Sequence, residues 1–243
     1  MSEKINVYLA GSMFCEADRM YNAYLAEKIR ERCGDVIDLY VPQENLSIND
    51  KTKCADSRDI FWGDYNRLQN TDIFIARIDG DIPPSGTSAE VGIMSQRIQH
   101  WEEGLTKVKK EMGQSATHAI CKDYYTRIAG NKPVILGLCT DSRNPKRTYL
   151  DAKNDLMKND DYESQYCYFN LFTIGCIKVN GCLTTSVDEL VDRIAKIVKK
   201  RTTSRYVVEE KFQGKIYDSA SATYSNYVLR IYNDGTSEVI KIE

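Results

Sequence analysis

Carboxylates, amides and hydroxyls gather in residues 70–94, which read NTDIFIARIDGDIPPSGTSAEVGIM. The apolar run 73–78 predicts a buried strand, and after a Gly/Asp/Pro/Ser loop a helix is expected to begin near Ser88, with Glu90 in its first turn. Unpaired N–H groups and the helix dipole favour an ionised carboxylate there. Gly86 lets a ligand approach the backbone closely. Glu90 is therefore either a nucleophile or an ordinary helix-start acid.

Further polar side chains are expected close to Glu90, namely Asp72, Asp79, Asp81 and Gln43. Paired carboxylates suit glycosyl transfer, because one can attack or stabilise an oxocarbenium-like centre while the other handles the leaving group. No GxGxxG follows the first predicted strand and no GxxxxGK[ST] occurs, so the dinucleotide and P-loop fingerprints are missing.

Histidine and cysteine usage narrows the chemistry. The chain has only two histidines, which argues against a Ser–His–Asp triad and against a His-rich metal site. Its eight cysteines are scattered without a CxxC pair, as expected for reduced structural thiols. We therefore expect no metal and no cofactor.

The charge balance bears on partners and location. The 33 Lys and Arg residues nearly match the 35 Asp and Glu residues, which does not favour nucleic acid or an anionic membrane as a partner. No apolar run reaches the roughly 18 residues that cross a bilayer, and the first residues lack a signal-peptide pattern. We expect a cytoplasmic protein.

Strand-like and helix-like segments alternate along most of the chain. Alternation of this kind predicts right-handed βαβ units and a parallel sheet covered on both faces, with ligands beyond the carboxyl ends of the strands, here at loops 11–15 and 79–87. Strands are expected at 5–10, 36–41, 73–78, 134–139 and 171–179, and helices at 17–33, 58–70, 88–130 with a break near Gly113, and after Ser186.

The pattern changes near residue 202. Alternating apolar residues and the Asn233-Asp234-Gly235 turn predict a small antiparallel β appendage. We therefore expect two units, an α/β domain over residues 1–201 and a β-hairpin appendage over 202–243.

Several short motifs resemble nucleoside 2-deoxyribosyltransferases. The most specific is SGTSAEVG at 85–92, and others are YLAGSMF at 8–14, Asp72-Ile73, KPVILG at 132–137, DSR at 141–143 and FNL at 169–171. The resemblance spans roughly residues 5–198. It implies a flavodoxin-like, doubly wound sheet of five parallel strands and an enzyme of nucleotide salvage that acts on 2′-deoxynucleosides and free nucleobases.

The resemblance also implies catalytic roles. Glu90 would attack the anomeric carbon of a 2′-deoxynucleoside, release the base and hold a covalent deoxyribosyl ester, which a second base or water then collects. Tyr8 would hydrogen-bond to Glu90 and orient it. Asp72 would contact the sugar or base and assist proton transfer.

Substrate-binding roles follow from the same resemblance. Gln43 would contact the base, and Phe14 would stack on it or close the pocket. Asn170 would reach the site of a neighbouring subunit, which implies a homo-oligomer. The predicted substrate-binding set is completed by Gly11, Ser12 and Gly86.

Three features depart from the family pattern. Pro84 occupies the position, six residues before Glu90, where the family carries a base-contacting aspartate. The helix after Glu90 has extra length over residues 97–128, and the β appendage lies outside the family core.

Three functions therefore remain open. The first is transfer of deoxyribose between bases. The second is hydrolysis of a nucleoside or nucleoside 5′-monophosphate, for which the basic run 143–147 could bind phosphate. The third is a non-catalytic nucleoside or nucleotide sensor on the same fold.

Overall fold

A computed structural model describes residues 4–50, 52, 56–79, 84–113, 117–140 and 170–202, and the backbone of 203, 207–218, 223–232 and 237–242. Asp81, the basic run 143–147 and the DSR motif therefore lie outside the described residues, as does Phe169. No helix in the described part is long and apolar enough to cross a membrane.

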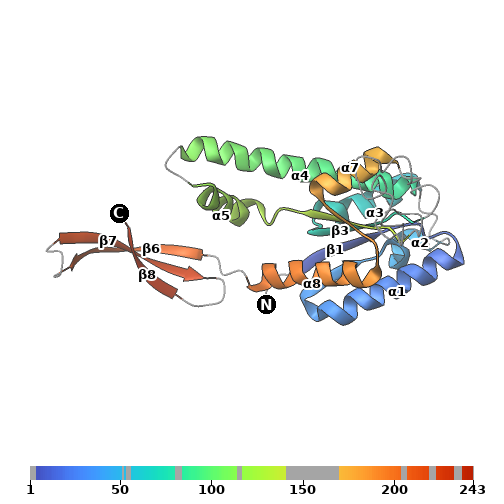
Figure 1. The fold of residues 1–243 in the computed structure, drawn as a ribbon, viewed down its shortest axis with the longest axis horizontal. Helices are drawn as coiled ribbons and strands as arrows, with labels where there is room; N and C mark the ends of the chain where they lie inside the picture. The colour runs from blue at the N-terminus through green and yellow to red at the C-terminus, as the bar shows by residue number, and fades with distance from the viewer. Residues whose placement is uncertain are drawn as a thin grey trace, which may run out of the picture.

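The centre of the fold is a sheet of five parallel strands (Figure 1). The order β2-β1-β3-β4-β5 is that of flavodoxin-like doubly wound proteins, with the switch point between β1 and β3. This confirms the predicted fold class. The strands span Ile37–Tyr40 (β2), Ile5–Ala10 (β1), Ile73–Arg77 (β3), Val134–Leu138 (β4) and Gly181–Thr184 (β5).

Helices cover both faces of this sheet (Figure 1). One face carries α1 (Glu16–Cys33) and α8 (Val187–Thr203), and the other carries α3 (Ser57–Gln69), α4 (Ser85–Met112) and α7 (Leu171–Asn180). Shorter elements are η1 (Gly34–Val36), η2 (Pro42–Glu44) and α2 (Leu46–Asn49), and α5 (His118–Ala129) follows α4. Gly34 ends α1 with a φ of 61°, which favours glycine.

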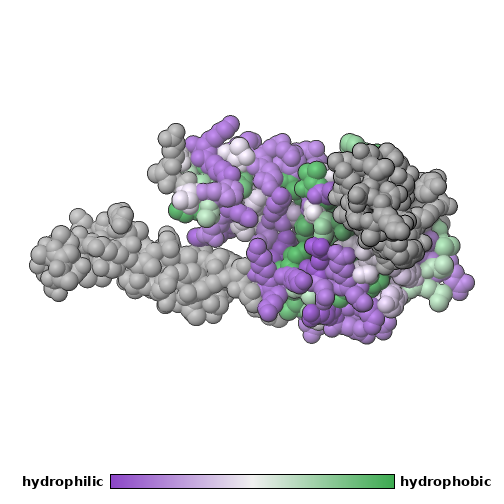
Figure 2. All heavy atoms as spheres, in the orientation of Figure 1, coloured by the Kyte–Doolittle hydropathy of each residue, from purple (hydrophilic) through white to green (hydrophobic). Residues whose placement is uncertain are grey.

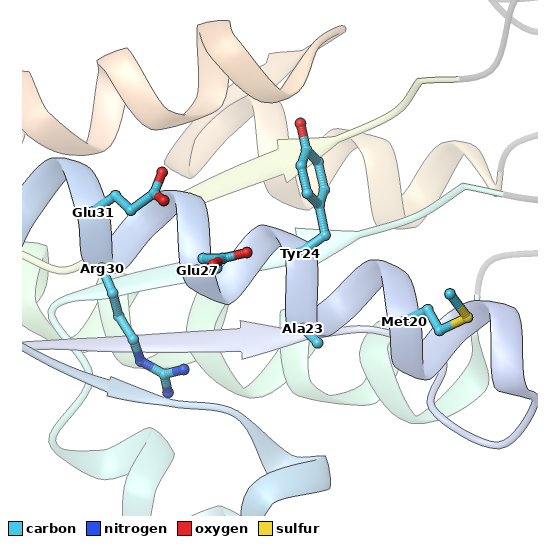
Figure 3. Close-up of a pocket in the computed structure, with 6 residues that line it drawn as sticks. All are labelled: Met20, Ala23, Tyr24, Glu27, Arg30 and Glu31. Atoms are coloured by element: carbon cyan, nitrogen blue, oxygen red, sulfur yellow. The ribbon is translucent and has the colours of Figure 1, made fainter.

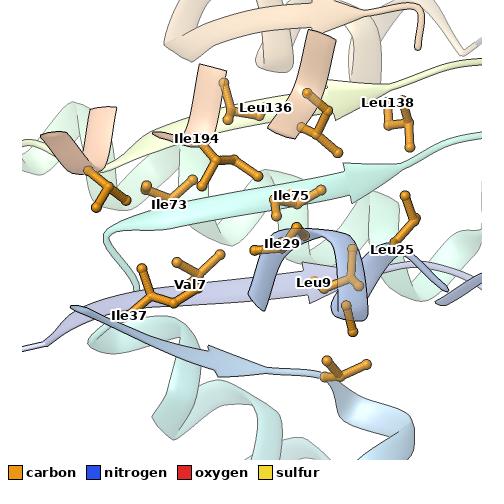
Figure 4. Close-up of a cluster of buried hydrophobic side chains, with 14 of the residues drawn as sticks. Val7, Leu9, Leu25, Ile29, Ile37, Ile73, Ile75, Leu136, Leu138 and Ile194 are labelled. Carbon is orange, nitrogen blue, oxygen red and sulfur yellow. The ribbon is translucent and has the colours of Figure 1, made fainter. Parts of the chain in front are cut away.

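Strand alternation divides the apolar side chains between two cores. Val7, Ile75 and Leu136 point toward α1 and α8, where they pack with Leu25 and Ile194 (Figure 4). The intervening residues point toward α3, α4 and α7 and include Tyr8, Phe74 and Ile135. The second core therefore brings a tyrosine from β1 beneath the helices that follow β2 and β3.

The predicted strand at 171–179 is wrong, because these residues form α7 and the fifth strand follows at Gly181–Thr184. A short apolar run fits a buried strand and a buried helix equally well by periodicity. The Asn170 side chain accepts a hydrogen bond from the Thr173 N–H at 3.1 Å and so caps the helix. Thr173, Ile174 and Ile177 are buried, on one helical face.

The extra length after Glu90 forms a helical hairpin. The predicted break near Gly113 is present, since α4 ends at Met112 and α5 begins at His118. The indole N–H of Trp101 donates to the Gly130 carbonyl at 3.0 Å, and the rings of Trp101 and Tyr125 lie 5.2 Å apart. The two helices thus share a small apolar cluster of their own.

The C-terminal backbone forms a second, antiparallel sheet in the order β6-β7-β8. Its strands are Val207–Asp218, Thr223–Tyr232 and Ser237–Ile242. The proposed division of the chain at residue 201 stays a prediction, and α8 continues to Thr203.

Candidate functional site

Tyr8 and Glu90 meet on the face of the sheet covered by α3, α4 and α7. The hydroxyl of Tyr8 donates to Oε1 of Glu90 at 2.5 Å, although the two residues lie 82 positions apart. Tyr8 comes from the middle of β1 and is fully buried, whereas Glu90 on α4 is half-buried. The hydroxyl of a residue on a central strand thus fixes one carboxylate oxygen of Glu90, while the rest of the side chain keeps partial access to solvent.

Glu90 lies in the second turn of α4, not in its first turn. The helix begins at Ser85, because Pro84 has a φ of −56° that suits the position before a helix. The unpaired N–H groups of the first turn therefore lie earlier in the chain than Glu90. The expected stabilisation of an ionised carboxylate by the helix start is wrong at this residue.

The environment of Glu90 shifts its proton affinity upward. Burial raises the pKa of Glu90 to about 7, the hydrogen bond from Tyr8 lowers it, and the nearby charge of Asp64 raises it again. The carboxyl group of Glu90 is thus near its midpoint at neutral pH. A carboxyl group with this proton affinity still ionises at neutral pH and is unusually basic once it is ionised.

Asp64 on α3 is a second carboxylate of this site, and the sequence analysis missed it. Its Oδ1 accepts a hydrogen bond from the Tyr40 hydroxyl at 2.8 Å. Burial raises the pKa of Asp64, while its hydrogen-bonding contacts with the hydroxyls of Tyr40 and Tyr8 lower it. The spacing in the sequence could have identified it. Asp64 precedes the apolar Leu68 by four residues, so the two share a helical face, and Leu68 is buried against the sheet.

The loop after β1 is anchored from the other face of the sheet. Arg77, at the end of β3, donates to the Ser12 carbonyl at 2.6 Å and pairs with Asp18 at 2.8 Å. Asn22 donates to the same carbonyl at 2.9 Å. A Cβ on Gly11 would lie 2.9 Å from Nε of Arg77, so the loop packs this closely only with glycine.

Three predicted substrate contacts belong to this anchored loop or its surroundings. Ser12 donates through its hydroxyl to Asp18 at 2.7 Å. Gln43 accepts from Asn22 at 3.0 Å and donates to the Arg19 carbonyl at 3.1 Å, so its amide is held by the protein. Phe14 is 83% exposed, as a side chain that could cover a ligand requires.

Asp72 is not brought to Glu90. It precedes β3, at the amino end of the strand, and its carboxylate accepts from the Asn6 N–H at 3.0 Å and from Arg201 at 2.8 Å. Ligands in such sheets bind at the opposite, carboxyl end. The predicted contact of Asp72 with sugar or base therefore does not fit the structure.

The remaining predicted residues lie on helix starts and loop ends. Gly86 is in the first turn of α4 with open space where a Cβ would be. Asn170 is exposed and caps α7 through its amide oxygen. Asp79, after β3, accepts from the backbone N–H of Thr140 after β4.

A hollow on the outer surface of the molecule is lined by α1 alone. Its residues are Met20, Ala23, Tyr24, Glu27, Arg30 and Glu31, and Figure 3 shows them along that helix. None of the site residues above contributes to it, so it does not extend the candidate site.

The fold and the carboxylate at its switch point place the protein among doubly wound α/β proteins with a flavodoxin-like sheet. The family model for nucleoside 2-deoxyribosyltransferase matches residues 7–102, a range that includes Tyr8, Asp64 and Glu90. The chain belongs to this family, whose members are pentosyltransferase-like enzymes that act on nucleosides and nucleobases.

The solved structures that are similar to the chain include two that illustrate the range of identity. The crystal structure of a conserved protein from Enterococcus faecalis V583 is 31% identical, with a TM-score of 0.54 over 82% of this chain and 99% of that chain. A 2-desoxiribosyltransferase from Leishmania mexicana is 16% identical, with a TM-score of 0.43 over 79% of this chain and 97% of that chain. No curated protein matches in the sequence comparison.

Proposed function

We propose that the protein is a nucleoside 2-deoxyribosyltransferase, which cleaves the N-glycosidic bond of a 2′-deoxynucleoside and transfers the sugar to another nucleobase. The observation that carries this proposal is the 2.5 Å hydrogen bond from buried Tyr8 to Glu90, beside the second carboxylate of Asp64. Family membership supplies the class of substrate. Salvage of bases in the cytoplasm is the corresponding cellular role.

The proposed first step forms an ester on Glu90. One carboxylate oxygen of Glu90 attacks C1′, the C1′–N bond breaks, and the departing base takes a proton from Asp64. Tyr8 holds the other carboxylate oxygen, so the attacking oxygen faces the sugar. The result is a covalent deoxyribosyl ester of Glu90, a free base and an ionised Asp64.

The second step reverses the first with a new base. A ring nitrogen of the incoming base attacks C1′, Glu90 leaves as a carboxylate, and Asp64 takes the proton that the nitrogen loses. Raised proton affinity suits Asp64 for both directions, because the same group gives and recovers one proton. No metal or cofactor takes part in this scheme.

Hydrolysis is the second candidate, and Pro84 favours it. The family pattern has an aspartate there that contacts the base, whereas proline offers neither a carboxylate nor an N–H. Weaker binding of the second base would let water collect the sugar. A sensor needs no activated carboxylate, so the Tyr8–Glu90 pair argues against that reading.

Base exchange tests the proposal directly. The protein is incubated with deoxyinosine or thymidine plus free adenine, and the products are separated by chromatography. New deoxyadenosine is expected, whereas free deoxyribose without exchange would indicate the hydrolase. We expect Glu90→Gln to lose at least about 1,000-fold in rate, because it removes the nucleophile. Glu103→Gln, an exposed position of the same helix, is the matched control.

Trapping tests the covalent step. A nucleoside with fluorine at C2′ slows formation and breakdown of the ester, since the transition state carries positive charge at C1′. Mass spectrometry of peptides should then find the added sugar on Glu90. Adduct on another residue, or full activity in Glu90→Gln, would refute the mechanism.

We also propose that the protein is a homo-oligomer in which Asn170 reaches the neighbouring site. Its amide oxygen caps α7 through the Thr173 N–H, and the residue is exposed. The amide NH₂ group is therefore the part of this side chain that would meet a sugar hydroxyl or the nucleophile of another copy.

A further inference from the structure

Tyr8 and Tyr40 are neighbours across the β1–β2 pair. They are Cα partners in the parallel register, and their ring centroids lie 5.1 Å apart. Adjacent strands are separated by about 4.8 Å, so the backbone fixes the spacing of the two phenols. Both hydroxyls reach carboxylates on helices of the same face, Tyr8 to Glu90 and Tyr40 to Asp64.

A chain of hydrogen bonds fixes the direction of the Tyr40 proton. Nδ2 of Asn45 donates to the Tyr40 hydroxyl at 2.9 Å, and that hydroxyl donates to Oδ1 of Asp64 at 2.8 Å. Because an amide NH₂ group can only donate, the Tyr40 oxygen accepts there and its single proton goes to Asp64. The single proton of Tyr8 is donated to Glu90.

Contacts around Tyr40 hold this arrangement. The guanidinium of Arg67 lies 5.0 Å from the centroid of the Tyr40 ring and pairs with Asp38 at 3.3 Å. Gly63 precedes Asp64 on α3, and a Cβ there would lie 3.2 Å from Cγ2 of Ile48 on α2. Glycine therefore lets α3 approach α2, the helix that Asn45 caps.

We propose that Tyr40, held by Asn45, is a positioning residue that fixes the orientation of the Asp64 carboxyl group for proton exchange with the base. Tyr8 then donates its proton to Glu90, and Tyr40 donates its proton to Asp64. One oxygen of Asp64 is held by Tyr40, which leaves the other for the proton that the base takes and returns. This inference rests on the proposed function.

The charged surroundings of Asp64 agree with this division. Burial raises its pKa, the Tyr40 and Tyr8 hydrogen bonds lower it, and the groups that face it are Tyr8 on β1, Tyr40 on β2 and Glu90 on α4. Arg67 on α3 lies over the Tyr40 ring. Loss of the Tyr40 hydroxyl therefore raises the pKa of Asp64 further.

The test is Tyr40→Phe, with kcat and KM measured across pH. We expect kcat to fall about tenfold while KM stays within about twofold, because one hydrogen bond to a catalytic carboxyl group is lost. The limb of the profile that reports Asp64 should move to higher pH, because the lost hydrogen bond had lowered the pKa of that carboxyl group. Asn45→Ser retains an oxygen that can cap α2 but loses the longer amide NH₂ group that donates to Tyr40, so a smaller change in the same direction is expected.

A second measurement needs no turnover. The titration of Asp64 is followed by ¹³C NMR in protein labelled at the aspartate carboxyl carbons, with the signal assigned by its loss in Asp64→Asn. Its midpoint should rise in Tyr40→Phe and stay fixed in Tyr24→Phe, an exposed tyrosine on α1. An unmoved midpoint together with wild-type kcat would overturn the inference. If the wild-type protein neither exchanges nor hydrolyses nucleosides, the proposed function fails, and the NMR midpoint alone decides whether Tyr40 sets Asp64.

Discussion

In the proposed mechanism the half-buried carboxyl group of Glu90 attacks in its ionised form, although burial and a neighbouring charge oppose its ionisation. Burial and the charge of Asp64 raise the pKa of Glu90, and the hydrogen bond from Tyr8 lowers it. The Tyr8 hydroxyl therefore has an electrostatic role as well as an orienting one. Its own pKa is raised by burial and by Glu90, so it stays protonated and can always donate.

This balance predicts a pH dependence. Because the pKa of Glu90 is about 7, kcat/KM should rise with pH through that value as the nucleophile ionises. Tyr8→Phe removes the interaction that lowers the pKa, so the acidic limb should move to higher pH. We also expect an approximately 10- to 100-fold loss in kcat/KM at neutral pH.

The measurement is a pH–rate profile of base exchange for wild type, Tyr8→Phe and Tyr24→Phe. The last variant removes an exposed hydroxyl and should leave the limb in place. A limb that moves to lower pH in Tyr8→Phe would contradict the assigned direction of the Tyr8 effect.

The Asp72–Arg201 pair joins two elements rather than serving the site. Arg201, near the end of α8, also donates to the Lys132 carbonyl at 2.7 Å, just before β4. Its side chain is 11% exposed and that of Asp72 is 25% exposed, so the pair is partly shielded from water. Together these contacts hold the last turn of α8 against the amino ends of β3 and β4.

We therefore expect Asp72→Asn to affect stability and not catalysis. The free energy of unfolding should fall by about 1–3 kcal/mol, because Arg201 loses its charged partner. The value of kcat/KM should stay within about twofold of wild type. Urea unfolding and the exchange assay measure the two quantities, with Asp64→Asn as the contrasting variant that should lose activity. A large loss of kcat/KM with unchanged stability would restore a substrate contact for Asp72.

Sequence patterns predicted the first four strands and most helices, because the apolar residues of each element repeat with one clear period or the element ends at a recognisable Gly or Pro. Residues 5–10 form β1 with the predicted bounds. The run at 171–179 could not be assigned, since its period fits two structures and the cap from Asn170 decides between them. The start of α4 was predicted three residues too late. Pro84 marks the true start, but it was considered only as the position where the family has an aspartate.

The site was predicted only where its residues follow the carboxyl ends of strands or lie within a strong motif. Glu90 and Tyr8 were identified on that basis, and the structure brings them together. Asp64 was missed because its contact with the site depends on how α3 rotates over the sheet. Asp72 was assigned a substrate contact from its motif alone. Its position at the amino end of β3, away from the end of the sheet where ligands bind, was not considered.

At the scale of the whole assembly, the proposed oligomer predicts complementation between two inactive proteins. Glu90→Gln lacks the nucleophile, and Asn170→Ser lacks the amide NH₂ group while it keeps an oxygen that can cap α7. When the two are mixed and allowed to exchange subunits, some sites combine an intact Glu90 with an intact Asn170. Random pairing of equal amounts as dimers would restore about a quarter of the sites.

Base exchange by the mixture, relative to each protein alone, measures this effect, and sedimentation confirms that mixed assemblies have formed. Mixed assemblies without any recovery would show that Asn170 acts within its own subunit or not at all.

The direct pairing of Tyr8 with Tyr40 has a consequence for protein engineering. The two phenols are set by backbone hydrogen bonds between β1 and β2, whereas the carboxylates stand on separate helices. A designer who grafts this chemistry onto another scaffold should therefore transplant the strand pair as one piece and fit the helices afterwards. A shift of one residue in the graft would turn both hydroxyls to the opposite side of the sheet and abolish the arrangement in a single step.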